Sequence, residues 1–206
     1  LDDRSRQYLL QHLEDIPDPL TRGSAWVTLW DNLLEAKLTP AEFLDLAVRA
    51  LPRETDEQNI QRILGYTTRA FWRHLPPDAR AARVAPLESV LRAGLDRAAT
   101  SSLKSAWFSA FRDVALTAAG VGWLERVWRR QETIASLPLA ETDEIALAQE
   151  LAVREVTSWR EIMQTQLERT QNPDRKARFA FVSPALSSDP AVREQAFERF
   201  RQLENR

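Results

Sequence analysis

The sequence has no cysteine and few glycines, and both shortages narrow what the chain can do. Its 206 residues include no cysteine and five glycines. Without cysteine there can be no disulfide, no thiolate nucleophile and no sulfur-ligated metal site. The scattered glycines form neither a phosphate-binding loop nor the nucleophile elbow of a serine hydrolase. These classes of site are therefore excluded.

Histidine is also scarce, which leaves little material for metal binding or for acid–base catalysis. His12 and His74 belong to separate predicted helices, and no H-E-x-x-H motif is present. Two acidic pairs, Asp56-Glu57 and Asp143-Glu144, fall in the first turns of predicted helices, where negative charge favours the helix dipole. We interpret them as capping groups. We expect no catalytic residue, no metal ligand and no cofactor within this chain.

The sequence also lacks a large excess of charge of one sign and any long apolar run. The 28 Lys and Arg residues against 30 Asp and Glu give a net charge of −2, which supplies no general field for nucleic acid or anionic lipid. No stretch approaches the ~18 apolar residues of a membrane span, and the opening LDDRSRQYLL is not a signal peptide. We therefore expect a soluble domain that binds neither nucleic acid nor membrane, in a compartment left open.

Hydrophobic periodicity predicts helices throughout. Apolar residues recur at spacings of three and four, separated by capping signals such as the Thr39-Pro40-x-Glu42 box, and no stretch alternates as a strand would. Helix starts fall near residues 18, 39, 55, 78, 102, 121, 142, 158, 173 and 190. Helix pairs thus recur at about forty residues, the period of HEAT and armadillo repeats. We predict an all-α, HEAT/armadillo-like superhelix of about ten antiparallel helices, forming a single domain over residues 1–206.

Some local features bear on this helix pattern. Pro86 either divides the helix that begins at Asp78 or kinks it, and Gly120 is predicted to end a helix in the left-handed conformation. The tryptophans share helix faces with Leu, Phe and Val, so we assign all of them to the core: Trp26, Trp30, Trp72, Trp107, Trp123, Trp128 and Trp159.

The segment NPDRKARFAFVSPALSSDP, residues 172–190, combines cations with aromatic residues. On a helical wheel Arg175, Lys176 and Arg178 share one sector. Apolar residues fall both beside that sector and opposite it: Phe179 and Val182 beside it, and Ala177, Ala180 and Phe181 opposite. One interpretation is a helix packed on both sides, with its cations held near a cavity or an interface for a carboxylate. The other is a solvated basic face.

Two stretches together resemble a known family. IPDPLTRGSAWVTLWDNLL at 16–34 and NPDRKARFAFVSPALSSDPAVREQAF at 172–197 resemble the C-terminal helical domain of zinc aminopeptidases of the aminopeptidase N family. The stretch SSLKSAWFSAFRDVALTAAGVGWLERVW at 101–128 fits the same domain, so the resemblance spans nearly the whole chain. Its most specific phrase is the Asp-Pro-Leu-Thr-Arg turn before the first Trp-x-x-x-Trp-Asp helix.

The resemblance implies a non-catalytic domain of a larger multidomain peptidase. In such an enzyme a separate domain of the same chain holds zinc and the glutamate base, while the helical domain closes over it and encloses a substrate chamber. The partners implied are that catalytic domain and the peptide substrate, with Arg175, Lys176 and Arg178 as candidates for binding a peptide carboxylate. We expect the fragment itself to be inactive and to lack the last helices of the family domain. The alternative is a free-standing HEAT-like scaffold that binds a protein partner.

Overall fold

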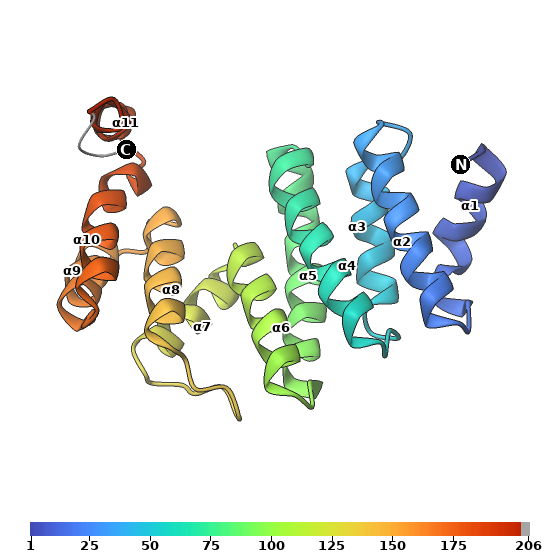
Figure 1. Ribbon diagram of the computed structural model, residues 1–206, viewed down its shortest axis with the longest axis horizontal. Coiled ribbons are helices and arrows are strands. Elements are labelled where there is room, and N and C mark those ends of the chain that lie inside the picture. Colours follow the sequence, from blue (N-terminus) through green and yellow to red (C-terminus); the bar gives the residue numbers. More distant parts are fainter. Residues whose placement is uncertain (203–206) are drawn as a thin grey trace. The chain divides into compact units, whose positions relative to one another are not determined.

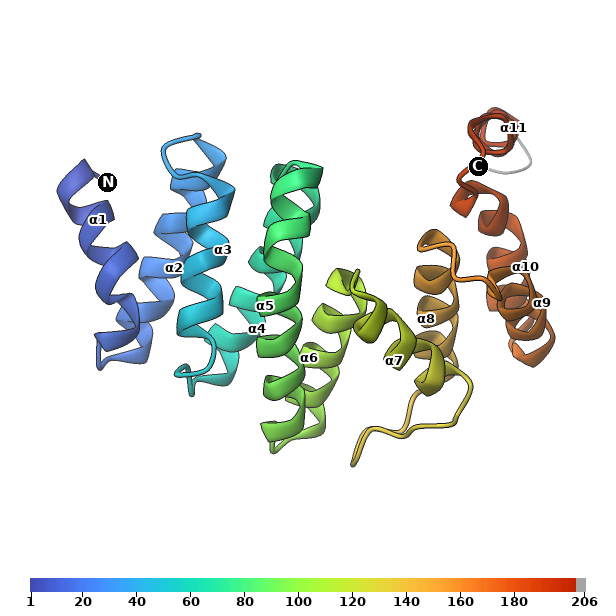
Figure 2. The ribbon, with the colours of Figure 1, turned by 180° about the vertical axis from the view of Figure 1, so that it is seen from behind.

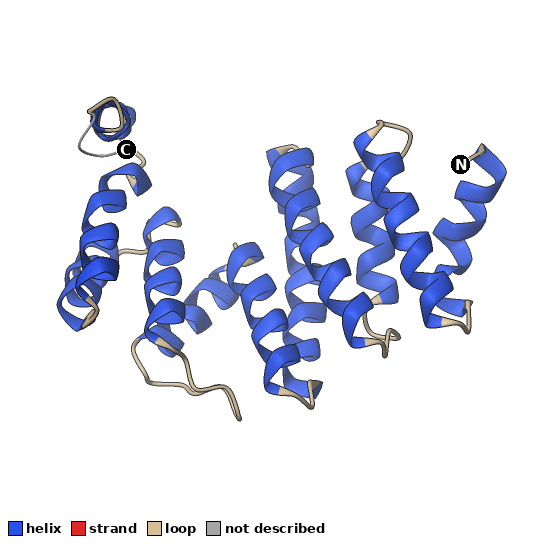
Figure 3. Cartoon of the chain, viewed as in Figure 1, coloured by secondary structure: helices blue, strands red, loops and turns tan. Residues whose placement is uncertain are grey.

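The computed structural model describes residues 1–202, and every regular element in that part of the chain is helical (Figure 3). Eleven α-helices follow one another along the described chain (Figure 1). The predicted all-α class is confirmed, whereas the superhelical path of the helix pairs stays a prediction. Residues 203–206, after which the family resemblance leads us to expect further helices, lie outside the described residues.

The chain divides into two compact units, Leu1–Thr117 and Ala118–Arg206, which we describe one at a time. The organisation of residues 1–206 as one domain stays a prediction. The first unit is drawn from blue to green in Figures 1 and 2. Its elements in chain order are α1 (Asp3–His12), η1 (Leu13–Asp15), α2 (Pro19–Leu34), α3 (Pro40–Ala50), α4 (Glu57–Arg69), η2 (Ala70–His74), α5 (Pro77–Arg97) and α6 (Ser101–Val114).

The second unit contains the remaining helices. Its elements are α7 (Ala118–Trp128), α8 (Glu141–Val153), α9 (Trp159–Arg169), α10 (Pro173–Val182), η3 (Ser183–Leu186) and α11 (Pro190–Arg199). Its core includes the indole of Trp128 on α7, which donates to the Gln166 side chain on α9 at 2.9 Å. Both side chains are buried, so this hydrogen bond satisfies polar atoms that would otherwise be costly to bury.

Short-range capping explains where most helices begin. The Thr39–Glu42 capping box is present at α3, and the Asp18 carboxylate accepts from the Thr21 backbone N–H at 2.8 Å at the start of α2. At α4 the cap is Asp56, one residue after the predicted start near 55, and its side chain accepts from the Asn59 N–H. The carboxylate of Asp143 accepts from a backbone N–H in front of α8. The interpretation of the acidic pairs as caps is therefore confirmed at Asp56 and Asp143.

A buried ion pair ties the start of α2 to the start of α4. The Arg22 guanidinium donates to both carboxylate oxygens of Glu54, at 2.9 and 2.6 Å, and also to the carbonyls of Ile16 and Pro17. The Arg22 and Glu54 side chains are 11% and 3% exposed. Burial opposes the charge on Glu54, but hydrogen bonds from Arg22 and from the backbone hold the pKa of that carboxyl below its ordinary value. The Asp-Pro-Leu-Thr-Arg turn thus has a structural role.

Helices α5 and α6 form an antiparallel hairpin that requires a glycine. A Cβ at Gly94 would lie 2.4 Å from the Trp107 ring, so α6 can approach α5 only because that atom is missing. Nearby, the buried Glu88 accepts from the backbone N–H groups of Leu116 and Thr117, at 2.7 and 2.8 Å. Pro86 lies inside a single helix, which resolves the choice left open by the sequence.

Two predictions about single residues are wrong. Gly120 lies within α7, and no glycine among the described residues has a positive φ, so it does not end a helix in the left-handed conformation. Trp72 is 37% exposed rather than part of the core, and Trp159 is half-buried. The remaining tryptophans are buried as predicted: Trp26, Trp30, Trp107, Trp123 and Trp128.

The Arg22–Glu54 pair makes a direct prediction about stability. Arg22→Ala leaves the Glu54 carboxylate buried without its main partner, so we expect a loss of about 3–5 kcal/mol in the free energy of unfolding. Urea unfolding followed by circular dichroism measures it. Arg53→Ala is the control, because Arg53 and Asp15 form a pair exposed by more than half and its loss should cost under about 1 kcal/mol. Equal losses would contradict the buried pair's importance.

Two helical glycines should respond in opposite ways to alanine. Gly94→Ala forces a Cβ into the Trp107 ring and should destabilise by about 1–3 kcal/mol. A Cβ at Gly65 meets no atom within 4 Å, so Gly65→Ala should stabilise by up to about 1 kcal/mol through helix propensity. Melting curves of the two variants distinguish these outcomes. A neutral Gly94→Ala variant would argue against the close approach of α5 and α6.

Candidate functional site

The predicted cations all lie on α10, and the structure places them on its exposed side. Asn172 caps this helix by accepting from the Arg175 backbone N–H at 3.0 Å, which fixes the first turn that carries Arg175 and Lys176. Arg175, Lys176 and Arg178 are all exposed. They come from one helix, and the helix start positions them as the sequence pattern predicts.

Of these three cations, Arg175 already has a partner. Its guanidinium donates to Glu141 at the start of α8, at 3.2 Å, and the other oxygen of Glu141 accepts from the Gln171 N–H at 2.7 Å. The Gln171 N–H and Arg175 together hold the pKa of the Glu141 carboxyl below its ordinary value. Arg175 therefore joins α10 to α8, and a ligand would have to compete with Glu141 for it.

Lys176 and Arg178 make no ion pair with any residue in the range 1–202. Between them and the unit's interior lies Phe179, which is 2% exposed. Ala177 and Ala180 are exposed, whereas Phe181, from the same sector, is half-buried and meets the Phe200 ring edge to face. The sector opposite the cations is thus partly covered, and both interpretations of the helix stay predictions. Both cations remain available to a partner that approaches from solvent.

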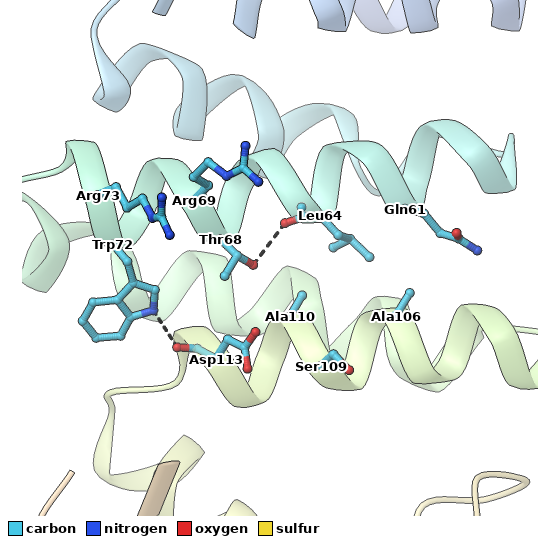
Figure 4. Close-up of a pocket in the computed structure, with 11 residues that line it drawn as sticks. Gln61, Leu64, Thr68, Arg69, Trp72, Arg73, Ala106, Ser109, Ala110 and Asp113 are labelled. Atoms are coloured by element: carbon cyan, nitrogen blue, oxygen red, sulfur yellow. Dashed lines mark hydrogen bonds between the residues drawn. The ribbon is translucent and has the colours of Figure 1, made fainter. Parts of the chain in front are cut away.

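A groove between α4 and α6 was not foreseen from the sequence (Figure 4). It has a volume of about 450 Å³, within the range of ligand pockets. Small side chains make its floor, and Gly65 contributes no side chain at all. Its lining consists of Gln61, Leu64, Gly65, Thr68, Arg69, Trp72, Arg73, Ala106, Ser109, Ala110 and Asp113.

Hydrogen bonds from η2 and α4 to α6 lie at the two ends of this groove. At one end the Trp72 indole donates to the Asp113 backbone carbonyl at 2.7 Å (Figure 4). At the other end the Gln61 amide donates to the Ser102 hydroxyl at 3.2 Å. These contacts hold the helices at a fixed separation, so the groove is a formed feature of the first unit.

The groove is cationic. Arg69 and Arg73 both line it and make no ion pair with a carboxylate among the described residues. Asp113 also lines it, but its carboxylate accepts from Arg112 at 2.9 Å. The sequence signals that could have revealed the groove are a glycine inside a helix, Gly65, followed by arginines at helical spacing. These signals do not predict a groove as long as Trp72, which lies between the two arginines, is expected in the core.

A second depression lies in the other unit and differs in its charges. Residues 129–140 form the connection between α7 and α8, which is drawn as a loop in Figure 3. This connection borders a pocket of about 510 Å³. Arg130 in its lining pairs with Glu144 at 2.8 Å. The charge of Arg130 is thus already neutralised. This pocket therefore offers an anionic ligand less positive charge than the α4–α6 groove does.

Metal and membrane sites receive no support from the described part of the chain. In residues 1–202 no three or more His, Asp or Glu side chains gather as metal ligands would. None of the helices described is both long and apolar enough to cross a bilayer.

Comparison with known proteins gives one informative similarity. The chain is 28% identical to Aminopeptidase N of Streptomyces lividans over 153 residues, which are 74% of this chain. The chain spans 18% of the length of that protein. No protein-family model matches the chain. The sequence is therefore distantly similar to part of an aminopeptidase. This is the kind of protein that the IPDPLTRG and NPDRKARF stretches resemble.

The geometry of α10 predicts that its faces contribute very differently to stability. Phe179→Ala removes a buried ring and should cost about 3–5 kcal/mol in the free energy of unfolding. Arg178→Ala removes an exposed side chain without an ion pair among residues 1–202 and should change stability by less than about 0.5 kcal/mol. Parallel urea titrations measure both. A large loss for Arg178→Ala would mean that its charge has a structural role, which would disqualify it as a binding probe.

Proposed function

We propose that this chain is a non-catalytic helical domain of a zinc aminopeptidase, where it encloses the substrate chamber and helps to bind peptide. The observation that carries the proposal is the similarity to Aminopeptidase N of Streptomyces lividans, together with the small share of that protein which the chain spans. A chain that corresponds to a fraction of a peptidase fits a domain that assists catalysis performed elsewhere.

The fold and the residue content support a binding role rather than a catalytic one. The chemistry of peptide hydrolysis would come from zinc and its ligands in a separate catalytic domain of the parent chain. This chain would supply surface and charge, and the isolated fragment should be inactive. Helical layers of this kind offer extended surfaces for peptides.

The α10 cations are the residues we assign to peptide binding in this function. Lys176 and Arg178 present charge without an ion-pair partner among residues 1–202, whereas Arg175 is shared with Glu141. A peptide's C-terminal carboxylate or an acidic side chain would be the complementary group. We expect Arg178 and Lys176 to contribute more than Arg175, because neither has to be released from an existing pair.

The test uses the complete protein encoded by the surrounding reading frame. In that protein Arg178→Ala should slow hydrolysis of peptides with a free C-terminal carboxylate by up to about tenfold, the effect of losing one partly exposed charge pair. Single-residue aminoacyl arylamides are too short to reach this domain and should be hydrolysed normally. The ratio of kcat/KM for the two substrates is the measurement.

Two controls make the result specific. Amidating the peptide's C-terminus should remove the additional effect of Arg178→Ala, because both changes delete the same pairing. Arg97→Ala removes an exposed arginine of the first unit and should leave both substrates unaffected. A reading frame without zinc-peptidase motifs, or a product without arylamidase activity, would favour the free-standing scaffold instead.

A further inference from the structure

The α4–α6 groove has an unusual backbone at its cationic end. The N–H of Leu75 bonds to the carbonyl of Ala70, five residues earlier, so the segment Ala70–His74 forms a π-helical turn. Such turns are rare and are frequently found at functional sites. Here the turn carries Trp72 and Arg73, both of which line the groove next to Arg69. The local distortion and the groove's charge thus coincide.

The arginines at the groove differ from most others in the first unit. Several arginines elsewhere in that unit pair with carboxylates, as Arg22 does with Glu54 and Arg83 with Asp45. Arg69 lies 5.9 Å from the Trp30 ring centroid, and neither Arg69 nor Arg73 pairs with a carboxylate among residues 1–202. Their guanidinium groups can therefore bind an external anion without first losing an internal one.

The groove's dimensions favour an extended occupant. A volume of about 450 Å³ is too small for more than a fragment of an α-helix, which is about 10 Å across. Arg69 ends α4 and Arg73 lies four residues further on, in the π-helical turn. Four residues of regular α-helix rise about 6 Å. In an extended peptide, side chains two positions apart point the same way and are separated by about 6.7 Å, a similar spacing.

We propose that the α4–α6 groove binds an extended peptide segment that carries two acidic residues in an alternating pattern, such as Glu-x-Glu, with its carboxylates paired to Arg69 and Arg73. The rest of the peptide segment lies along the groove, where α6 contributes small side chains such as Ser109 and Ala110 (Figure 4). The ligand is recognised by internal acidic side chains, so no free C-terminus is needed. This site is separate from the α10 cations and does not depend on the proposed function of the chain.

The direct test is binding of a capped acidic peptide to the 206-residue chain. The probe is fluorescein-Gly-Ser-Glu-Ala-Glu-Ser-amide, which has no terminal carboxylate, and its fluorescence anisotropy is titrated with protein. We expect saturable binding, and a loss of about tenfold in affinity when either Glu of the peptide is replaced by Gln. No binding at 1 mM protein would overturn the proposal. So would equal binding of a peptide in which Gln replaces both Glu residues.

Matched protein variants locate the binding. Arg73→Gln and Arg69→Gln should each weaken binding about tenfold. Arg62→Gln makes the same charge change on the same helix, but Arg62 lies toward Gly23 of α2 and does not line the groove, so affinity should be unchanged. An equal loss for Arg62→Gln would mean that net charge alone attracts the peptide, which would refute the site.

A variant that fills the groove distinguishes blocked binding from misfolding. Gly65→Leu places a side chain where a Cβ meets no atom within 4 Å, so the helix should keep or improve its stability while the groove is occupied. We expect peptide binding to be lost and the melting temperature to be retained. Full affinity in a stable Gly65→Leu variant would place the peptide elsewhere and overturn the proposal.

Discussion

The first unit depends on burying Arg22 and Glu54 together. Each group alone would be costly to remove from water, but Glu54 also accepts from the backbone N–H groups of Thr55 and Asp56, so its charge is compensated on several sides. The pair joins the first turn of α2, which contains Arg22, to the loop before α4, which contains Glu54. The pair holds the loop before α4 against α2, and Asn59 of α4 adds a hydrogen bond to the Pro19 carbonyl at 2.8 Å.

The features that the sequence predicted well are local. An N-cap such as Thr39 or Asn172 bonds to a backbone group three residues away, so a short window contains both donor and acceptor. Helical periodicity is local in the same sense, which is why the all-α class and the positions of most helices could be predicted. Even so, Thr55 and Asp56 compete for one cap, and the sequence pattern did not distinguish them.

The features that the sequence did not predict depend on distant partners. Trp72 fits a core pattern, but its indole bonds to the Asp113 carbonyl on α6, and this contact leaves the ring at the surface. Gly120 follows a helix end in the sequence, yet the chain forms an extended link and starts α7 before reaching it. The groove depends on a distant partner in the same way: Gly65 and the arginines after it signal one wall, on α4, but the other wall belongs to α6. Only tertiary packing brings them together.

The two cation clusters differ in what they offer a ligand. On α10 the cations project into water from one helix, and Arg175 is already engaged by Glu141, so an approaching carboxylate gains little beyond screened attraction. At the groove the cations border a concave surface, where a bound peptide would exclude water from the guanidinium groups and strengthen each pair. Neither arginine there would need to leave a carboxylate first. Lys176 and Arg178 also lack internal ion pairs, so it is concavity, rather than free charge or the number of cations, that would make the groove the stronger anion site of the two.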